Sequence, residues 1–470
     1  MVFPSVEFLF FFFPVFLLFY TVVPYKNLSI LVFSLIFYAW GEGVYILLLL
    51  GTIVINFIAA KQLSKVTVEG AKIILSIGVF LDLAILFYYK YFGFIVGSVL
   101  KLPIPEDGFP LLPLGISFFI FQSISYLVDV YRKDAPPADS LFDVALYISM
   151  FPQLIAGPIV RYSFVAEAIK TRTVELEQFR DGTFLFVGGM CSKVLIANNA
   201  AEISDVAFSL PLEQISSLTA WIGSIAYAIQ IFFDFAGYST MAIGIGLVMG
   251  FRFPLNFNYP YVACSITNFW RRWHMSLSSW FRDYLYIPLG GNQKGSVRTY
   301  VNLFLVFFLC GLWHGAAWNF VIWGMFHGFL LVIERLGLKG ILDGGPRFLA
   351  HIYTLLMVLI GWILFRAESM DQAIVFIRSL FIIRDAEIPS ELIRILNYEN
   401  LLFILMGIIL SMPVVPRFLK VLNIFPSMDV HEKYSTMQNT MVVTLSLAGM
   451  AICSIYVISG TYNPFIYFRF

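Results

Sequence analysis

Long apolar runs recur along almost the whole chain, and they limit its fold more than any other feature of the sequence. The runs at 8–23, 28–40, 44–60 and 73–89 carry at most one charged residue each. A helix needs about 20 apolar residues to cross a hydrocarbon core that is about 30 Å thick, and it pairs all its backbone polar groups within the segment. The chain is 60% hydrophobic and 13% charged, whereas soluble proteins are about 25% charged. The sequence therefore predicts an all-α polytopic membrane protein.

Further runs bring the total to roughly eleven to thirteen membrane elements at about 20 residues per span. Two of them, 218–235 and 238–248, are expected to be separate. The run at 142–160 contains Pro152, Gly157 and Pro158, which a regular helix facing lipid tolerates badly. We therefore predict a re-entrant element enclosed by protein there. We expect one integral membrane domain over 1–470, with a motif-bearing core at about 111–366 and C-terminal helices in 400–460.

The charges between the runs predict the orientation. Basic residues gather in 61–72, 132–133 and 161–180, so these segments are expected in the cytoplasm with the N-terminus outside. The net charge of +1 does not indicate nucleic-acid binding. Four cysteines are scattered without metal-ligand spacing, which predicts neither a disulfide framework nor a metal site. No bound cofactor is expected.

The stretch 259–328 holds three of the five histidines. If 268–286 is one helix, its tryptophans lie within an arc of about 140° and most of its charged residues lie opposite. His274 then lies in the apolar arc, where an imidazole needs a hydrogen-bond partner. A histidine satisfied by a backbone carbonyl is the simple explanation for such a position.

His314 is flanked by small residues in Gly311-Leu312-Trp313-His314-Gly315-Ala316. Small neighbours let another backbone or a substrate approach the ring. An ionisable group at membrane depth is costly and indicates function. An imidazole, with an ordinary pKa of about 6.5, can take a proton from a hydroxyl and return it to a thiolate. A histidine that only packs between helices is the alternative.

Two other polar groups are candidates. On one straight helix, His327 would lie about 20 Å from His314 and on the opposite face. It is then structural, or a second site on a pathway, unless the helix breaks, for instance at Gly324. Asp234 is a second ionisable group in an apolar run. We expect it to pair with an arginine of the central helix, in a structural role rather than a catalytic one.

At these residues the chain resembles a known family. "QIFFDFAGYSTMAIGIGLVMGFRFPLNFNYPYVACSITNFWRRWHMSLSSWFRDYLYIPLGGN" and "GLWHGAAWNFVIWGMFHG" are similar to the membrane-bound O-acyltransferase superfamily. The similarity is strongest to the bacterial branch that acetylates alginate, peptidoglycan and cellulose. "LPLGISFFIFQSISYLVDVYR", "FPQLIAGPIVRY" and "GWILFRAE" fit the same branch. The resemblance covers most of 1–366 and implies a helical funnel with a tunnel through the membrane.

The resemblance also implies roles for individual residues. His314 matches the near-invariant histidine of the family, and His274 matches a second motif position that is His, Asn or Asp across the superfamily. His314 would activate the accepting hydroxyl, and His274 would orient it or stabilise the thioester oxyanion. The expected substrate-binding residues are Trp313, Arg271, Arg272 and Asp234. The two arginines could meet coenzyme A phosphates, although interfacial anchoring explains them equally well.

The implied reaction takes an acyl group from a cytoplasmic donor, expected to be acetyl-CoA. The group passes across the bacterial inner membrane to a periplasmic partner resembling an SGNH-type esterase, which O-acetylates an extracellular polysaccharide. Three alternatives stay open. Relatives that share this core transfer D-alanine to teichoic acid. A transporter or flippase would use the histidines as proton relays. A structural membrane subunit would have no chemistry of its own.

Overall fold

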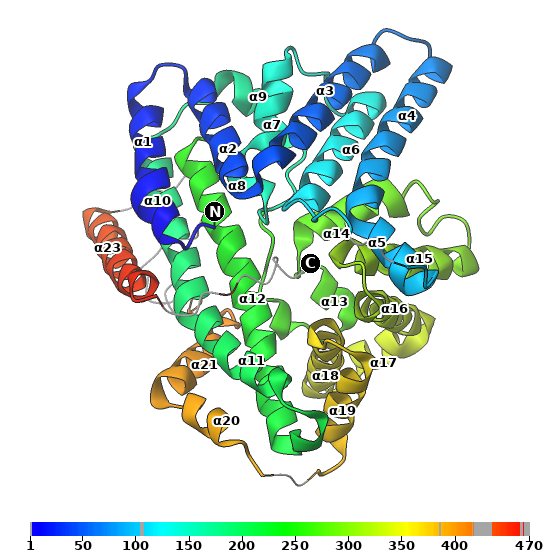
Figure 1. Cartoon of the computed structure of the whole chain (residues 1–470), viewed down its shortest axis with the longest axis vertical. Coiled ribbons are helices and arrows are strands. Elements are labelled where there is room, and N and C mark those ends of the chain that lie inside the picture. Colours follow the sequence, from blue (N-terminus) through cyan, green and yellow to red (C-terminus); the bar gives the residue numbers. More distant parts are fainter. Residues whose placement is uncertain are drawn as a thin grey trace. The chain divides into compact units, whose positions relative to one another are not determined.

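A computed structural model describes residues 2–103, 108–384, 387–415, 417, 435–460 and 464 of the chain. Within these residues the regular secondary structure is helical (Figure 1). Eight helical stretches of this part are long and apolar enough to cross a membrane. The first of them, Lys26–Leu63, is divided at Gly43, whose φ of +53° interrupts the helix. The two apolar runs predicted there are therefore two helices.

The chain divides into two compact units, and each is described by itself. The first unit comprises Met1–Phe186 and Met241–Pro254, and the second comprises Val187–Thr240 and Leu255–Phe470. The helices of the first unit are α1 (Phe13–Val22), α2 (Lys26–Glu42), α3 (Ile46–Leu63), α4 (Val68–Leu86), α5 (Phe92–Phe94), α6 (Ile116–Arg132), α7 (Leu141–Ser149), α8 (Phe151–Leu154) and α9 (Tyr162–Thr171).

Two helices, α10 (Leu176–Cys191) and α12 (Ser217–Val248), have residues in both units. The helices of the second unit are α11 (Asn198–Ser209), α13 (Ile266–Trp270), α14 (Met275–Phe281), α15 (Ser296–His314), α16 (Trp318–Ile333), α17 (Lys339–Gly344), α18 (Arg347–Arg366), α19 (Met370–Phe381), α20 (Ser390–Ile395), α21 (Tyr398–Leu410) and α23 (Thr436–Ile458). The predicted C-terminal helices in 400–460 correspond to α21 and α23, and 418–434 lie outside the described residues.

The separation predicted between 218–235 and 238–248 is wrong, because α12 is one helix of 32 residues. Its glycines mark close contacts with α10. A Cβ on Gly244 would lie 2.5 Å from the carbonyl oxygen of Gly182, and a Cβ on Gly237 would lie 2.7 Å from that of Gly189. Glycine lets two backbones meet here without interrupting the helix.

The break and the enclosure predicted for 142–160 are confirmed, and its re-entry from one side of the membrane stays a prediction. All residues from Val144 to Val160 are buried, and α7, which begins with a capping box between Ser140 and Asp143, is only 9 residues long. The hydroxyl of Tyr147 donates to the carbonyl of Val160 over 2.9 Å, so the returning chain lies beside α7. The segment thus turns back within the first unit, enclosed by other helices.

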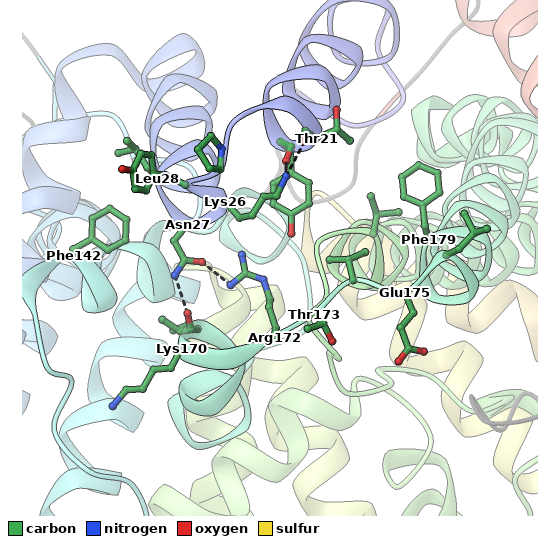
Figure 2. Close-up of a pocket in the computed structure, with 17 residues that line it drawn as sticks. Thr21, Lys26, Asn27, Leu28, Phe142, Lys170, Arg172, Thr173, Glu175 and Phe179 are labelled. Carbon is green, nitrogen blue, oxygen red and sulfur yellow. Dashed lines mark hydrogen bonds between the residues drawn. The ribbon is translucent and has the colours of Figure 1, made fainter.

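The segments predicted to be cytoplasmic meet in the first unit. Lys170 pairs with Asp139 at 2.5 Å, and the charge of Lys61 also acts on that carboxylate. The amide of Asn27 donates to the carbonyl of Ile169 over 2.8 Å (Figure 2). These contacts bring the turns after α1, α3 and α6 to the end of α9, as expected for segments on one side of a membrane.

A cavity of about 1020 Å³ lies at this junction. Residues of 20–28 and 169–179 are among those that line it (Figure 2). Its basic side chains already have partners in the fold. Arg172 donates from Nε to the carbonyl of Met249 over 2.8 Å and from a terminal nitrogen to Asn27 over 2.5 Å. The hydroxyl of Tyr20 donates to the same Met249 carbonyl over 2.8 Å. Arg172 therefore ties α1, α9 and the end of α12 together.

Candidate active site

The helices α15 and α16 form a hairpin that carries His314 at its bend. His314 is the last residue of α15, the chain reverses at 315–317, and Trp318 begins α16. The two helices meet backbone to backbone: a Cβ on Gly311 would lie 2.4 Å from the carbonyl oxygen of Phe320, and one on Gly324 would lie 2.3 Å from that of Phe307. The small residues around His314 therefore admit α16 and do not leave open space.

His314 is enclosed by aromatic rings and is only 6% exposed. Its imidazole makes edge contacts with Trp313, Trp323 and Phe365, at centroid distances of 5.0, 5.0 and 5.3 Å. Water is largely excluded from such a site, so electrostatic interactions with the ring are stronger than they would be in solution.

The single helix predicted over 268–286 is wrong, because the chain breaks at His274. α13 ends at Trp270 and α14 begins at Met275, while His274 has φ +43° and ψ +55°. This is the left-handed region, which residues other than glycine seldom adopt. Backbone hydrogen bonds to 256–258 hold the turn: Met275 donates to Asn256 over 2.9 Å, and Asn258 donates to Arg272 over 3.0 Å.

Asn256 also fixes the imidazole of His274. Its Oδ1 accepts the backbone N–H of Ser276 over 3.2 Å, so this atom is the carbonyl oxygen of the amide. The Nδ1 atom of His274 lies 3.0 Å from that oxygen and must donate to it. A neutral imidazole has one N–H, so Nε2 carries the lone pair. The expected partner was a backbone carbonyl, and the actual partner is a side-chain amide.

The other nitrogen of this ring, Nε2, is buried. Nε2 of His274 has no hydrogen-bond partner among the described residues, and the side chain is 1% exposed. Burial, followed by the proximity of His314, lowers the pKa of His274 well below its usual range. The ring is therefore neutral at pH 7, and its Nε2 can accept a proton or a hydrogen bond.

The two predicted catalytic histidines lie against one indole. The ring centroid of Trp313 is 6.0 Å from that of His274 and 5.0 Å from that of His314. The imidazoles are therefore no farther apart than the sum of these distances. Phe235 of α12 covers His274 from another side, at a centroid distance of 4.6 Å. Residues distant in the sequence thus form one buried cluster in the second unit, as predicted for His274 and His314.

The separation of about 20 Å expected between His327 and His314 on one helix is wrong, because the hairpin reverses at 315–317 and not at Gly324. Both imidazoles contact the indole of Trp323, at 5.0 Å for His314 and 5.2 Å for His327. His327 accepts the indole N–H of Trp270 at Nδ1 over 3.4 Å. A Cβ on Gly361 would lie 2.6 Å from its Nε2. These contacts support the structural role predicted for His327.

The predicted arginine partner of Asp234 is wrong. The carboxylate pairs with Lys193 at 2.8 Å, and the two side chains are 2% and 1% exposed. Lys193 also donates to the side chain of Asn198 over 2.7 Å. Lys193 lies on the π-helical segment Ser192–Ala197, which continues α10. A buried pair with hydrogen bonds of this kind is costly to break on one side only, as expected for a structural role.

The two predicted phosphate-binding arginines differ in their surroundings. Arg272 donates from Nε to Asn268 over 3.1 Å and from a terminal nitrogen to the carbonyl of Asn258 over 3.0 Å. Its guanidinium therefore holds the turn before His274. Arg271 is exposed. Substrate binding by Arg271, Arg272, Trp313 and Asp234 stays a prediction.

Sequence reasoning missed Asn256 and Glu334, which position the turn at His274. Glu334 is the residue that follows α16. Its carboxylate accepts the backbone N–H groups of Ile266 and Thr267 over 2.5 and 2.9 Å, and it accepts the Thr267 hydroxyl over 2.6 Å. It caps the N-terminus of α13, where a negative charge is favourable. No local pattern in the sequence links these residues, because their partners are distant along the chain.

The fold and the site together define a class: a helical protein with several apolar spans that buries two imidazoles against one tryptophan. The family model described as "MBOAT, membrane-bound O-acyltransferase family" matches residues 112–369, which is more than half of the chain. The chain belongs to the membrane-bound O-acyltransferase family. It is a multi-pass membrane protein and an acyltransferase.

Individual relatives narrow the comparison. The chain is 45% identical over 408 residues to the "Probable alginate O-acetylase AlgI" of Pseudomonas putida, covering 84% of this chain and 83% of the relative. It is 33% identical to the "Peptidoglycan O-acetyltransferase" of Helicobacter pylori, covering 95% and 92%. It is 32% identical to the "Teichoic acid D-alanyltransferase" of Bacillus subtilis, covering only 46% and 58%.

Proposed function

We propose that this protein takes an acetyl group from cytoplasmic acetyl-CoA and passes it across the bacterial inner membrane for O-acetylation of an extracytoplasmic polysaccharide. A periplasmic SGNH-type protein would complete the transfer to the polymer. The names of relatives that match nearly the whole chain support acetyl transfer, to alginate in one case and to peptidoglycan in the other. The observation that carries the proposal is that two buried imidazoles, those of His274 and His314, both contact the indole of Trp313.

In this proposal, His314 is the general base. It takes the proton from the accepting hydroxyl as the oxygen attacks the thioester carbonyl, and it returns the proton to the departing thiolate of coenzyme A. An O-acetyl ester and free coenzyme A thiol result. Such proton transfer contributes about 100-fold to 10,000-fold in rate. The aromatic rings around His314 would keep water from competing with the acceptor.

The tautomer of His274 limits what that residue can do. Because Nδ1 donates to Asn256, the neutral ring offers a lone pair at Nε2. It can accept a hydrogen bond from the hydroxyl and orient it, but it cannot donate one to an oxyanion. We therefore keep the orienting role for His274 and set aside oxyanion stabilisation, the other role implied by the family resemblance.

A donor for the oxyanion is present next to His314. The indole N–H of Trp323 is buried and has no hydrogen-bond partner among the described residues, and its ring lies 5.0 Å from that of His314. A buried N–H without a partner is costly unless a ligand or water pairs with it. We propose that it donates to the carbonyl oxygen of the acyl group as negative charge develops there.

The test is acetyl transfer by the purified protein in proteoliposomes. Radiolabelled acetyl-CoA is supplied outside, and an SGNH-type protein with its polymer is enclosed inside. Label on the internal polymer that depends on both proteins supports the proposal. Label supplied as D-alanyl carrier protein tests the teichoic acid reaction in parallel. Transfer from D-alanyl carrier protein but not from acetyl-CoA would show that the protein is a D-alanyltransferase and refute the proposed acetylation. Absence of transfer from either donor would favour the transporter alternative.

A further inference from the structure

A long groove follows one face of α18 in the second unit. It has a volume of about 790 Å³. Its lining residues on α18 recur at helical spacing over four turns: Arg347, Phe348, His351, Ile352, Leu355, Leu356, Val358, Leu359 and Trp362. At 1.5 Å per residue, the stripe from Arg347 to Trp362 is about 22 Å long. The groove is therefore elongated along the helix axis.

The opposite walls of the groove are apolar. One face of α12 contributes residues at successive turns, Trp221, Ile225, Ala228 and Ile229. Ile408 of α21 and Met412, just after that helix, contribute as well. Leu355, at the middle of the groove, is 37% exposed. α18 itself is long and apolar enough to cross a membrane. An apolar groove in such a helix faces hydrocarbon and not water.

The mouth of the groove carries a positive charge. Arg347 is the first residue of α18 and is exposed, and the described residues include no ion-pair partner for it. His351, one turn further, donates from Nδ1 to the carbonyl of Ala263 over 3.0 Å. Arginines at the ends of membrane helices lie at the level of the lipid headgroups. The groove therefore starts at that level and extends inward.

The inner end is closed by aromatic side chains. Trp362 donates from its indole nitrogen to the hydroxyl of Tyr261 over 3.1 Å, and that hydroxyl donates to the carbonyl of Ala228 over 2.5 Å. The other side of Trp362 packs on Trp273, at a centroid distance of 4.7 Å. These contacts separate the groove from the histidines, so it is a site distinct from the proposed acetyl-transfer centre.

We infer that this groove binds one anionic phospholipid, with the phosphate on Arg347 and one acyl chain lying along α18 to Trp362. The length of the groove, about 22 Å, agrees with the thickness of one lipid leaflet, because a bilayer with its headgroups is about 40–45 Å thick. The charge agrees, because an exposed guanidinium that has no ion-pair partner among the described residues favours a phosphate. The apolar walls agree with a hydrocarbon chain, which makes no polar contact along its length.

The experiment uses the full-length protein in nanodiscs that contain equal amounts of phosphatidylglycerol and phosphatidylethanolamine with matched chains. Lipids that remain bound after release into mild detergent are identified by native mass spectrometry. The wild type is expected to retain one phosphatidylglycerol in preference to phosphatidylethanolamine. R347Q should lower this preference about fivefold, the effect of one basic residue at a membrane surface, and R347E should lower it further. R335E, an exposed arginine outside the groove, is the matched control.

A second pair of variants tests the acyl chain. Leu355→Trp fills the groove and should abolish retention of the lipid. Leu349→Trp places the same side chain on α18 at an exposed position that does not line the groove, and it should retain the lipid. Equal retention of both lipids by the wild type, or retention unchanged in R347E and Leu355→Trp, would overturn the inference. A dimer without lipid would overturn it in favour of an interface between two copies.

Discussion

The side-chain oxygen of Asn256 lies 3.0 Å from Nδ1 of His274 and also accepts both the backbone N–H and the hydroxyl of Ser276. Three donors therefore converge on one oxygen, and this fixes its identity and the position of the proton on the imidazole. Among the described residues, no hydrogen bond joins Asn256 to His314 or Trp313. It acts on the proposed chemistry through His274, as a positioning residue.

Substituting Asn256 should change the pH dependence of acetyl transfer. In Asn256→Asp, a carboxylate next to His274 favours the protonated ring and raises its pKa. Because the proposed mechanism needs the neutral ring, the acidic limb of the pH–rate profile should move to higher pH, with activity retained above it. Asn256→Ala should lose activity at every pH and should also lose stability, since the donors of Ser276 are left unpaired. A profile in Asn256→Asp identical to that of the wild type would exclude the positioning role.

His314→Ala should lower acetyl transfer by about 100-fold to 10,000-fold, the usual effect of losing a general base. The three rings around His314 mean that alanine also leaves a cavity, so His314→Asn, which preserves more of the volume, is made alongside. Transfer is measured per amount of folded protein, by size-exclusion chromatography and thermal unfolding of the same sample. Near wild-type transfer in both variants would refute the catalytic assignment.

His327→Ala provides the contrast. Its ring is 1% exposed and accepts the indole N–H of Trp270, so removing it leaves a buried donor unpaired at a cost of about 1–3 kcal/mol. We expect a lower melting temperature and less protein in the membrane, with activity per folded molecule close to that of the wild type. A loss of activity per molecule as large as in His314→Ala would place His327 in the reaction.

Trp323→Phe tests the proposed oxyanion donor. The substitution keeps an aromatic ring against His314 but removes the indole N–H. Loss of one such donor costs about 100-fold to 1,000-fold in kcat elsewhere, and we expect an effect of that order, with little change in KM. Trp270→Phe, which removes an N–H bonded to His327, is the matched control. Equal, small effects of both substitutions would assign Trp323 to packing alone.

The backbone contact between α15 and α16 should be sensitive to a single methyl group. In Gly311→Ala, the new Cβ meets the carbonyl oxygen of Phe320 at 2.4 Å, so the hairpin must open and His314 must move. We expect lower thermal stability together with lost activity. In Gly340→Ala, on α17, the Cβ meets nothing within 4 Å, and stability should be unchanged or rise by about 0.4–1 kcal/mol. Similar melting temperatures for the two variants would contradict the packing described here.

The orientation of the first unit can be measured by cysteine labelling from either side of intact cells. We expect single cysteines at Lys65, Lys133 and Glu175 to be reached only from the cytoplasm. Glu175 is used because it is exposed, whereas the neighbouring Arg172 holds α9 to Met249. Periplasmic labelling of any of the three positions would reverse the predicted topology.

Much of the fold could be predicted because hydrophobic runs and prolines act locally. The run at 142–160 shows this. Its two prolines indicate, from the sequence alone, that no long helix forms there, and in the structure the run is buried among other helices. The glycines of α12 show the limit of the same reasoning. The runs 218–235 and 238–248 were expected to be separate, but they form one helix whose glycines contact α10. That contact depends on a partner helix that local sequence does not identify.

The residues of the candidate site could be predicted from the sequence, but the backbone geometry that positions them could not. His274 and His314 stand out by their neighbours, and the structure brings both to Trp313. The break at His274 was missed, because it depends on partners that are distant along the chain. Asn256 accepts the backbone N–H of Met275, just after the break, and Glu334 accepts the N–H groups at the start of α13. An amphipathic pattern continues across the break, so periodicity indicated one helix where two short ones form.

The left-handed backbone at His274 has a consequence for how this reaction centre can vary. Among residues with a side chain, Asn, Asp and His tolerate a positive φ best. These are the same three residues that the family resemblance implies for this motif position. The main chain therefore restricts the residue at this position before the chemistry does. A lysine or tyrosine placed there to create a different acid or base would occupy a conformation that costs L-residues about 1–2 kcal/mol, a cost that the chain bears at Lys133 and Tyr259. Redesign of the acceptor chemistry therefore begins with the turn at 271–274 and not with the side chain it presents.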